Sequence, residues 1–385
     1  MATRRDTLGI LGAALGAIGT PLAWGRADPQ DEPLKAIAAR KGMRFGNAMG
    51  MQGDEKRRQR FYDPAYRALM ARECGLLVAE NEMKWQAVQP EAGPHRFAAV
   101  DDMFGWARRE GMLLRGHTLL WQSPRWLPKW VNALDFSKQP AGAAESLLRQ
   151  HIQAVCGHFG RDIISYDVIN EAVNPQDGKL IGNVFAARMG ALEQIDLAFH
   201  LAREAAPGAQ LVYNDYMAPR AGDALHRAGV LELLASLKAR GTPVDALGLQ
   251  SHIASSDAMA GAAGRQAERA WRAFLDEVSG MGYALLITEF DVNDRELPAG
   301  FAERDAGAAA LARDYLDLTL SYPKCRDLLL WGMADHVSWL QEWKGVERAD
   351  GLPQRPTPFD SNLRAKPMRG AIAAAMRAMP GRAAL

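Results

Sequence analysis

Short apolar runs alternate with longer stretches of helical periodicity from about residue 45 to the end of the chain. Runs rich in Leu, Val and Ile that are bounded by Gly, Pro or polar residues are typical of strands buried on both faces. This pattern predicts eight such strands: Phe45–Met49, Leu76–Ala79, Leu113–Thr118, Ile164–Ile169, Leu211–Asn214, Ala246–Gln250, Leu285–Thr288 and Leu328–Gly332.

The segments between these strands carry helix signals. Asp63 and Pro64 are a helix N-cap and a first-turn proline, and they predict a helix that continues to Glu73. The segment Ala143–Phe159 has apolar residues on one face and ends at a glycine. The other predicted helices are Val100–Glu110, Gly190–Ala205, Asp223–Arg240, Arg265–Ser279, Arg304–Ser321 and a last one that opens at Lys366-Pro367.

Eight strand–helix repeats predict an α/β protein with a single (β/α)8 barrel, a TIM barrel. No linker rich in Ser, Thr or Pro interrupts the repeats, so residues 28–385 are expected to form one catalytic domain. The composition, with 48% hydrophobic and 24% charged residues, is that of a globular protein. The formal net charge of +1 gives no global attraction to nucleic acid or to an anionic membrane. We therefore expect no nucleic-acid partner.

Residues 1–27 differ from the rest of the chain. Arg4 and Arg5 precede the weakly apolar stretch Leu8–Leu22, which is too short to cross a bilayer that requires about 20 apolar residues. Small residues follow near Ala23 and Ala27, so the segment is predicted to be a twin-arginine-type signal peptide. The mature protein is expected to be periplasmic or extracellular, without stable membrane association after signal removal, and monomeric.

The three cysteines are widely spaced and form no C-x-x-C pair, so a structural zinc site is not expected. One disulfide is possible in an oxidising compartment, but buried free thiols are the expected state. No cofactor and no metal are predicted.

Polar, aromatic and titratable residues follow each strand from the second to the eighth. In such barrels the reactive side chains lie at the carboxyl ends of the strands. The residues at these positions are Glu80, Asn81, Lys84 and Trp85 after strand two, His117 and Trp121 after three, Asn170 and Glu171 after four, Asn214, Asp215 and Tyr216 after five, Gln250 and His252 after six, Glu289 and Asp291 after seven, and Trp331 and Trp339 after eight.

Glu171 and Glu289 form the most informative pair, because each ends an apolar strand of the same form. A single glutamate in such a position is usually solvated or salt-bridged, since Glu is rarely fully buried. Two of them at one end of a narrow barrel could approach to about 5–5.5 Å, the geometry of a retaining glycosidase. One carboxylate would attack the anomeric carbon, and the other would protonate the leaving oxygen and then activate water.

The neighbouring residues fit this chemistry. Asn170 could donate a hydrogen bond to the sugar 2-OH. His252 and Asp291 could hold Glu289 ionised and oriented, although a single histidine is as often structural. Four tryptophans in loop positions are expected to stack on sugar rings, namely Trp85, Trp121, Trp331 and Trp339.

Seven motifs, in order, resemble those of glycoside hydrolase family 10, the endo-1,4-β-xylanases. They are Glu80-Asn81-Glu82-Met83-Lys84-Trp85, Gly116-His117-Thr118-Leu119-Leu120-Trp121, Asp167-Val168-Ile169-Asn170-Glu171-Ala172, Tyr213-Asn214-Asp215-Tyr216, Gln250-Ser251-His252, Ile287-Thr288-Glu289, and Trp331-Gly332 through Ser338-Trp339. The resemblance extends from about Phe45 to Met368, almost the whole mature chain.

The resemblance implies Glu171 as acid/base and Glu289 as nucleophile in endo-hydrolysis of xylan with retention. It implies that the −1 subsite is lined by His117, Asn170, Gln250, His252 and Trp331, and the −2 subsite by Glu80, Asn81 and Lys84. Trp121 and Trp339 would be walls, with Trp339 excluding a C5 hydroxymethyl group and so favouring xylose. Tyr216 would line the +1 side.

The chain departs from the family pattern after Trp121. Family members usually have His-Ser-Gln there, and this chain has Gln122-Ser123-Pro124-Arg125-Trp126. This segment is expected to border the +1 subsite, so the departure bears on aglycone binding and on product length.

Three alternatives remain open at this stage. The first is a metal-dependent barrel hydrolase that uses His117, His252, Asp291 and His336, although His-x-His and His-x-x-x-His spacings are absent. The second is a catalytically silent carbohydrate-binding barrel, which should have lost a carboxylate at position 171 or 289. The third is a β-1,4-glucanase or mannanase of the same clan, against which the Lys84-Trp85 and Gln250-Ser251-His252 segments favour xylan.

Overall fold

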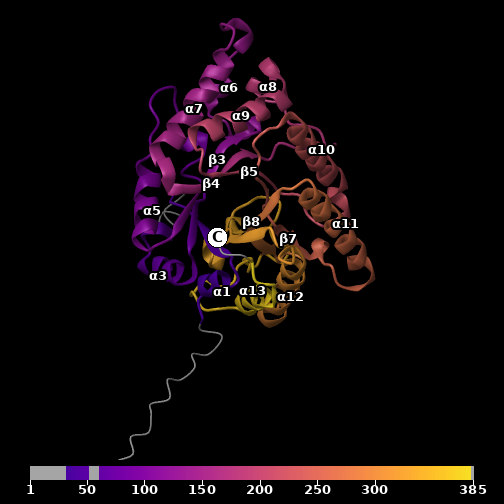
Figure 1. Ribbon diagram of the computed structural model, residues 1–385. Helices are drawn as coiled ribbons and strands as arrows, with labels where there is room; N and C mark the ends of the chain where they lie inside the picture. The colour runs from indigo at the N-terminus through magenta and orange to yellow at the C-terminus, as the bar shows by residue number, and fades with distance from the viewer. Residues whose placement is uncertain (1–31, 52–59, 383–385) are drawn as a thin grey trace, which may run out of the picture. The chain divides into compact units, whose positions relative to one another are not determined.

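The computed structural model describes residues 32–51 and 60–382, and the predicted signal segment 1–27 lies outside them. Within these ranges, parallel strands are ringed by helices (Figure 1). The strands are β1 Arg44–Met49, β2 Leu76–Ala79, β3 Leu113–Trp121, β4 Ile163–Asn170, β5 Gln210–Asp215, β6 Ala246–Leu249, β7 His252–Ala254, β8 Ala284–Asn293 and β9 Cys325–Leu330.

Most of the helices follow the prediction closely. The helices of two turns or more are α1 Leu34–Arg40, α3 Pro64–Glu73, α5 Ala98–Arg109, α7 Ala143–Phe159, α9 Ala191–Ala205, α10 Ala224–Arg240, α11 Gly261–Gly280, α12 Phe301–Thr319 and α13 Pro367–Ala378. The shorter ones are α4 Trp85–Val88, α6 Lys129–Asn132 and α8 Val184–Met189. Among the described helices, none combines the length and apolar character that crossing a membrane requires.

The strands close into a barrel, which confirms the predicted fold. Parallel pairing runs from β1 through β6, then from β6 to β8, from β8 to β9 and from β9 back to β1. These eight strands are the eight predicted ones. The short strand β7 lies outside the closed ring and pairs only with the end of β8, where His252 is opposite Asp291. That pairing lengthens β8 beyond its predicted end, so Glu289 lies within the strand and not after it.

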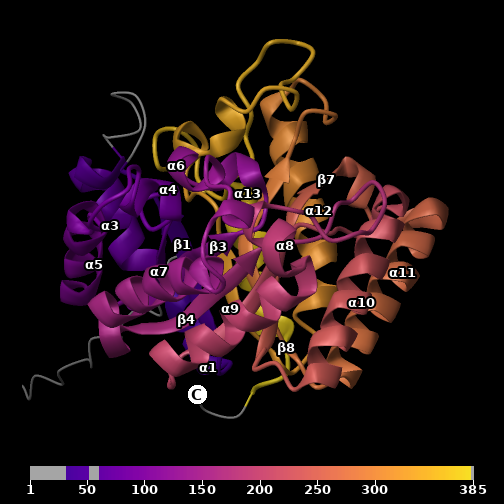
Figure 2. The same ribbon diagram turned by 90° about the horizontal axis from the view of Figure 1, so that it is seen from above.

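Two layers of apolar packing hold the barrel. Alternate strand residues such as Leu77 and Ala79 pack outward in the large core shared with the helices. Their neighbours Leu76 and Val78 pack inward in a small cluster made of barrel strands and Trp331. The opposite faces of each strand are therefore both buried, which explains the nearly continuous apolar runs. In Figure 2, turned by 90°, the segment that follows β9 projects at one end of the molecule.

Candidate active site

The carboxyl ends of the barrel strands carry the predicted site residues. Glu171 follows β4 directly, Gln250 follows β6 and Trp331 follows β9. Because all these strands are parallel, their carboxyl ends open at the same end of the barrel. Hydrogen bonds through Asn214 and Gln250 link Glu171 and Glu289 into one connected group.

Glu289 is buried within β8, with 5% of its surface exposed. Asn214 Nδ2 donates to one of its carboxylate oxygens across 2.8 Å, and His252 Nε2 lies 3.4 Å from the other. His252 Nδ1 in turn lies 3.0 Å from Asp291 Oδ1. The imidazole therefore bridges two carboxylates.

The electrostatics around Glu289 favour its ionised form. Burial alone would raise the pKa of Glu289, but the hydrogen bond from His252 and the charges of His117, His252 and Lys84 outweigh burial and lower it. The pKa of His252 rises to about 10, because the attraction of Asp291 and Glu289 exceeds the opposing effect of burial. A charged imidazole thus holds Glu289 as a carboxylate at neutral pH.

Glu171 has the opposite environment. Burial, followed by the nearby charges of Asp215 and Glu289, raises its pKa to about 7, although hydrogen bonds to the carboxylate oppose this rise. Those hydrogen bonds come from Gln250 Nε2 and Trp121 Nε1, each at 2.9 Å. Glu171 has a φ of 54°, a left-handed conformation that is unusual for a residue with a side chain and typical of functional sites.

Amide side chains connect the two glutamates. Asn214 Nδ2, which donates to Glu289, also donates to Asn170 Oδ1 across 2.9 Å. The Asn214 backbone oxygen accepts the N–H of Glu171 at 2.9 Å. Asn170 Nδ2 is buried and has no hydrogen-bond partner within residues 32–51 and 60–382, which leaves a buried donor for a ligand hydroxyl.

The position of Asn214 depends on a glycine in the next strand. Gly248 of β6 pairs with Asn214 of β5. A Cβ atom on Gly248 would lie 2.3 Å from Asn214 Oδ1 and 3.1 Å from Thr288 Cγ2. Thr288 Oγ1 already donates to the same Asn214 oxygen across 2.7 Å. Asn214 is predicted from the sequence only to follow the fifth strand, with no role. The importance of Gly248 has no sequence signal, because it arises only from the strand register.

A second buried charge group supports His117 from within the barrel. Asp167 of β4 accepts a hydrogen bond from Arg115 Nη2 across 2.5 Å and lies 2.9 Å from His117 Nδ1. Arg115 and Asp167 are each 1% exposed. Although burial would raise it, the pKa of Asp167 is lowered by Arg115 and His117. Neither residue is predicted from the sequence to be part of the site. The available signal is Arg115, a charged residue within an apolar strand.

The polar residues after β2 form a third group beside Trp121. Arg60 donates to Glu80 across 2.8 Å, and Lys84 Nζ donates to Asn81 Oδ1 across 2.8 Å. Lys84 Nζ also lies 4.7 Å from the Trp121 ring centroid. Burial lowers the pKa of Lys84, against the attraction of Glu289, Glu80 and Glu171. Because Trp121 also donates to Glu171, this group lies beside the two glutamates.

Three of the four tryptophans expected to bind sugar contact predicted site residues. They are Trp121, Trp331 and Trp339. Trp339 Nε1 donates to Asp291 Oδ2 across 2.7 Å, and its ring packs edge-on against His252 at 5.0 Å. Trp331 packs edge-on against His117 at 5.3 Å.

The prediction for Trp85 is wrong. This side chain is 2% exposed, begins helix α4 and stacks on His151 with ring centroids 3.8 Å apart. Its indole N–H bonds Gln89 across 2.8 Å. Trp85 is therefore a core residue, because its segment forms a helical turn and not an open loop.

Tyr216 follows β5 as predicted, and its ring packs edge-on against His226 at 4.7 Å. His226 Nε2 lies 3.0 Å from the buried Asp215, which also accepts from the hydroxyl group of Tyr213. Asp215 raises the pKa of Glu171 through its charge, so it belongs to the site electrostatically. From the sequence, Asp215 is predicted only to follow the fifth strand, with no role.

Gln122, the first departure from the family pattern, points into the protein. Its side chain exchanges hydrogen bonds with Gln194 at 3.3 and 3.0 Å and donates to the Ile181 oxygen at 2.8 Å. The next residues form a 3-10 turn, Pro124–Trp126, and the Trp126 ring stacks on Trp121 with centroids 4.6 Å apart. Trp126 and the exposed Arg125 are therefore the residues of this segment that reach toward the site.

Two further observations concern the cysteines and the histidines. Cys74, Cys156 and Cys325 are buried free thiols, as expected. In the part of the chain that the structure describes, no group of three or more His, Cys, Asp and Glu residues is arranged to hold a metal ion. His336, one of the residues in the metal-dependent alternative, packs instead against Tyr66.

A parallel barrel whose carboxyl end links a glutamate with a lowered pKa to one with a raised pKa has the features of a glycoside hydrolase. The comparisons with known proteins agree. The family model described as Glycosyl hydrolase family 10 matches residues 33–375. The chain therefore belongs to glycosyl hydrolase family 10.

Relatives of known name cover most of this chain. Endo-1,4-beta-xylanase 5 of Pyricularia oryzae is 28% identical over 354 residues, which are 90% of this chain and 79% of the relative. Endo-1,4-beta-xylanase 3 of Hypocrea jecorina is 30% identical over 308 residues, 79% of this chain and 76% of the relative. The crystal structure of xylanase 10B from Thermotoga petrophila in complex with xylobiose is 26% identical, with a TM-score of 0.75, and covers 89% of this chain and 97% of that one.

Proposed function

We propose that this protein is an endo-1,4-β-xylanase that hydrolyses internal xylosidic bonds with net retention of configuration. The observation that carries the proposal is the contrast between two linked glutamates. Burial raises the pKa of Glu171 to about 7, whereas His252 and its neighbours lower that of Glu289. Such a pair supplies a proton donor and a nucleophile for one bond at neutral pH.

The reaction has two steps. A Glu289 carboxylate oxygen attacks the anomeric carbon, the glycosidic C–O bond breaks, and Glu171 transfers its proton to the leaving oxygen. The negative charge of Glu289 is one cause of the raised pKa of Glu171, and forming the ester removes this charge. Glu171 therefore becomes a stronger acid and stays ionised. It then takes a proton from water, whose oxygen bonds to the anomeric carbon while the bond from that carbon to Glu289 breaks and releases the Glu289 carboxylate. The carboxyl groups are expected to lie about 5–5.5 Å apart when substrate is bound.

The −1 subsite is formed by residues that surround this pair. Asn170 Nδ2, buried and unpartnered among the described residues, is suited to the sugar 2-OH. His117, Gln250, His252 and Trp331 complete the subsite. His252 bridges Glu289 and Asp291, so Asp291 acts by orienting the imidazole.

The neighbouring subsites follow the same end of the barrel. Glu80, Asn81 and Lys84 would bind the −2 sugar, and Tyr216 would line the +1 side. Trp121 and Trp339 would be the walls. Because the Trp339 indole is fixed by its hydrogen bond to Asp291, it would exclude a C5 hydroxymethyl group and favour xylose.

Product analysis distinguishes this proposal from a β-1,4-glucanase or mannanase and from a silent binding protein. Xylan, cellulose and mannan would be incubated with the protein and followed by NMR. We expect internal cleavage of xylan with the β-anomer formed first. Preferential cleavage of cellulose or mannan would establish the glucanase or mannanase alternative. Binding of xylan without any turnover would establish the silent one.

We also propose that the chain is exported through a twin-arginine-type signal. The support is the Arg4-Arg5 pair ahead of a short, weakly apolar stretch. Replacing both arginines by lysine should retain the full-length protein inside the cell. Normal export of that variant, or export of neither protein, would contradict this proposal.

A further inference from the structure

Arg125 is an exposed cation at the edge of the active site. It lies in the 3-10 turn Pro124–Trp126, in the segment that departs from the family pattern. Its guanidinium carbon is 4.7 Å from the Trp126 ring centroid and 5.3 Å from that of Trp343. Those centroids are 6.4 Å apart. This triangle means that Arg125 caps both rings and is not inserted between them.

The two rings are continuous with the walls of the active site. Trp126 stacks on Trp121 at an interplanar angle of 21°, and Trp121 donates to the acid/base Glu171. Trp343 packs edge-on against Trp339 with centroids 5.5 Å apart. Arg125 is therefore connected to the predicted wall Trp121 through Trp126, and to the predicted wall Trp339 through Trp343.

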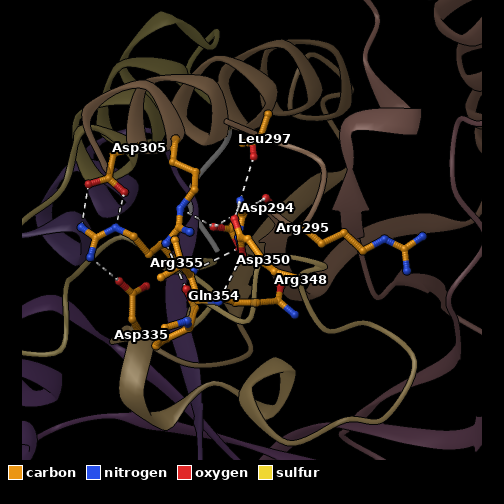
Figure 3. Close-up of polar contacts among 12 residues, drawn as sticks. Asp294, Arg295, Leu297, Asp305, Asp335, Arg348, Asp350, Gln354 and Arg355 are labelled. Atoms are coloured by element: carbon orange, nitrogen blue, oxygen red, sulfur yellow. Dashed lines mark hydrogen bonds and ion pairs between the residues drawn. The ribbon is translucent and has the colours of Figure 1, made fainter. Parts of the chain in front are cut away.

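The segment that carries Trp343 is fastened at its base. Figure 3 shows the group of charged and amide side chains that holds it. Arg348 donates to the backbone oxygen of Asp294 and, across 3.0 Å, to that of Leu297, and it pairs with Asp350 at 2.6 Å. Gln354 donates to the Leu340 and Val346 oxygens at 3.2 and 2.7 Å. The segment that carries Trp343 is thus fixed by hydrogen bonds and ion pairs of Arg348 and Gln354.

Arg125 differs from the arginines of that group in its partners. Arg348 pairs with Asp350, and Arg355 pairs with Asp305 at 2.7 Å. Arg125 has no hydrogen bond or ion pair with any residue in the described ranges. A guanidinium that rests on aromatic rings is held in place while its N–H groups stay available, and their fork matches a carboxylate.

We propose that Arg125 binds the carboxylate of an acidic, uronic-acid-type substituent on the xylan chain and so favours acidic xylan over neutral xylan. This inference rests on the proposed function, because the substituent must belong to a xylan seated between the tryptophan walls. The guanidinium forms two parallel N–H···O bonds with the carboxylate. Trp126 and Trp343 fix the direction of the fork.

The test compares one polysaccharide in two forms. The first is xylan that carries uronic acid substituents, and the second is the same xylan after reduction of its carboxyl groups to primary alcohols. We expect the wild-type protein to have the higher kcat/KM on the acidic form. In Arg125→Gln the ratio of the two kcat/KM values should fall roughly tenfold, the effect of one charge-assisted hydrogen-bond pair.

Two variants serve as controls. Arg125→Lys keeps the charge and loses the fork, so its ratio should lie between those of wild type and Arg125→Gln. Arg161→Gln makes the same change in net charge at an exposed residue before β4, at the opposite end of the barrel, and should keep the wild-type ratio. In about 1 M NaCl, where the screening length is about 3 Å, the wild-type preference should shrink.

Three results would overturn the proposal. One is an equal kcat/KM of the wild type on both forms. Another is an unchanged ratio in Arg125→Gln, including a parallel loss on both forms, which would indicate a structural role in the aromatic group. A third is an equal fall in Arg161→Gln, which would indicate a general charge effect. Failure of the wild type to cleave either form would instead refute the proposed xylanase function, so the two failures are distinguishable.

Discussion

Gln250 donates a 2.9 Å hydrogen bond to the carboxylate of Glu171. Its backbone oxygen accepts the N–H of Glu289 across 3.0 Å. One residue after β6 therefore contacts the proposed proton donor through its side chain and the proposed nucleophile through its backbone. The hydrogen bond to Glu171 favours the ionised form and lowers its pKa against the effect of burial.

Replacing Gln250 by Ala should shift the pH dependence of the reaction. Without this donor, the ionised form of Glu171 loses a stabilising bond and its pKa rises further. The alkaline limb of the kcat/KM profile should therefore move to higher pH, together with a loss of rate of roughly tenfold from the damaged −1 subsite. A pH series on a soluble xylo-oligosaccharide measures both effects. An alkaline limb that stays in place or moves down would contradict this role of Gln250.

The wild-type profile should be bell-shaped. The proposed mechanism requires protonated Glu171, so kcat/KM should fall as the pH rises through about 7. It also requires ionised Glu289, whose pKa is lowered, so the acid limb should lie below the ordinary pKa of 4.5. These are apparent values of the coupled pair. Initial rates across the pH range check them, and an alkaline limb near pH 5 would disagree with the buried environment of Glu171.

Glu171 should also affect stability in a pH-dependent way. Its folded pKa of about 7 exceeds its ordinary value of 4.5, so its contribution to stability is fully present below pH 4.5 and is lost as the pH rises through about 7. Gln in its place does not ionise. The Tm of Glu171→Gln minus the Tm of the wild type should therefore become more positive from pH 5 to pH 8, by about 2 °C or more. Thermal unfolding at both pH values measures it, and a difference that is constant or that decreases would refute the assignment.

Gly248→Ala should disturb the site without touching either glutamate. The added Cβ would lie 2.3 Å from Asn214 Oδ1, so the amide that joins Glu289 and Asn170 must move. We expect a stability cost of about 1–3 kcal/mol and a fall of at least about tenfold in kcat. The matched control is Gly157→Ala in helix α7, where a Cβ meets nothing within 4 Å and helix propensity favours Ala. Equal behaviour of both variants in unfolding and xylanase assays would be inconsistent with the packing described.

The fold and the position of Glu171 and Glu289 at one end of the barrel could be predicted from the sequence because their signals are local. An apolar run that ends in Glu171 indicates both a strand and a reactive end, and the helix Ala143–Phe159 was predicted with its observed bounds. The strand β7 could not be predicted in this way. It has three residues, and it exists because His252 pairs with Asp291, which lies far away in the sequence.

The remaining site residues depend on contacts across the barrel. The importance of Gly248 follows from its register with Asn214, which no local pattern shows. The prediction for Trp85 was wrong for a related reason. Its neighbours suggested an exposed loop, but four residues of helix and a stacking partner, His151, bury the ring. Buried aromatic packing is a tertiary property, so the sequence position alone did not distinguish Trp85 from Trp121.

The two catalytic assignments are tested most directly by azide rescue of Glu171→Ala and Glu289→Ala with an aryl β-xylobioside. Both variants should lose roughly 10³-fold or more on xylan, while Glu171→Ala should be relatively spared on the aryl substrate, whose leaving group needs little acid assistance. In Glu171→Ala, azide replaces water in the second step, so we predict a β-glycosyl azide by NMR. In Glu289→Ala, azide attacks from the face that the nucleophile occupied, so we predict an α-glycosyl azide. Exchanged anomers, or near-wild-type rates on xylan in both variants, would contradict the account.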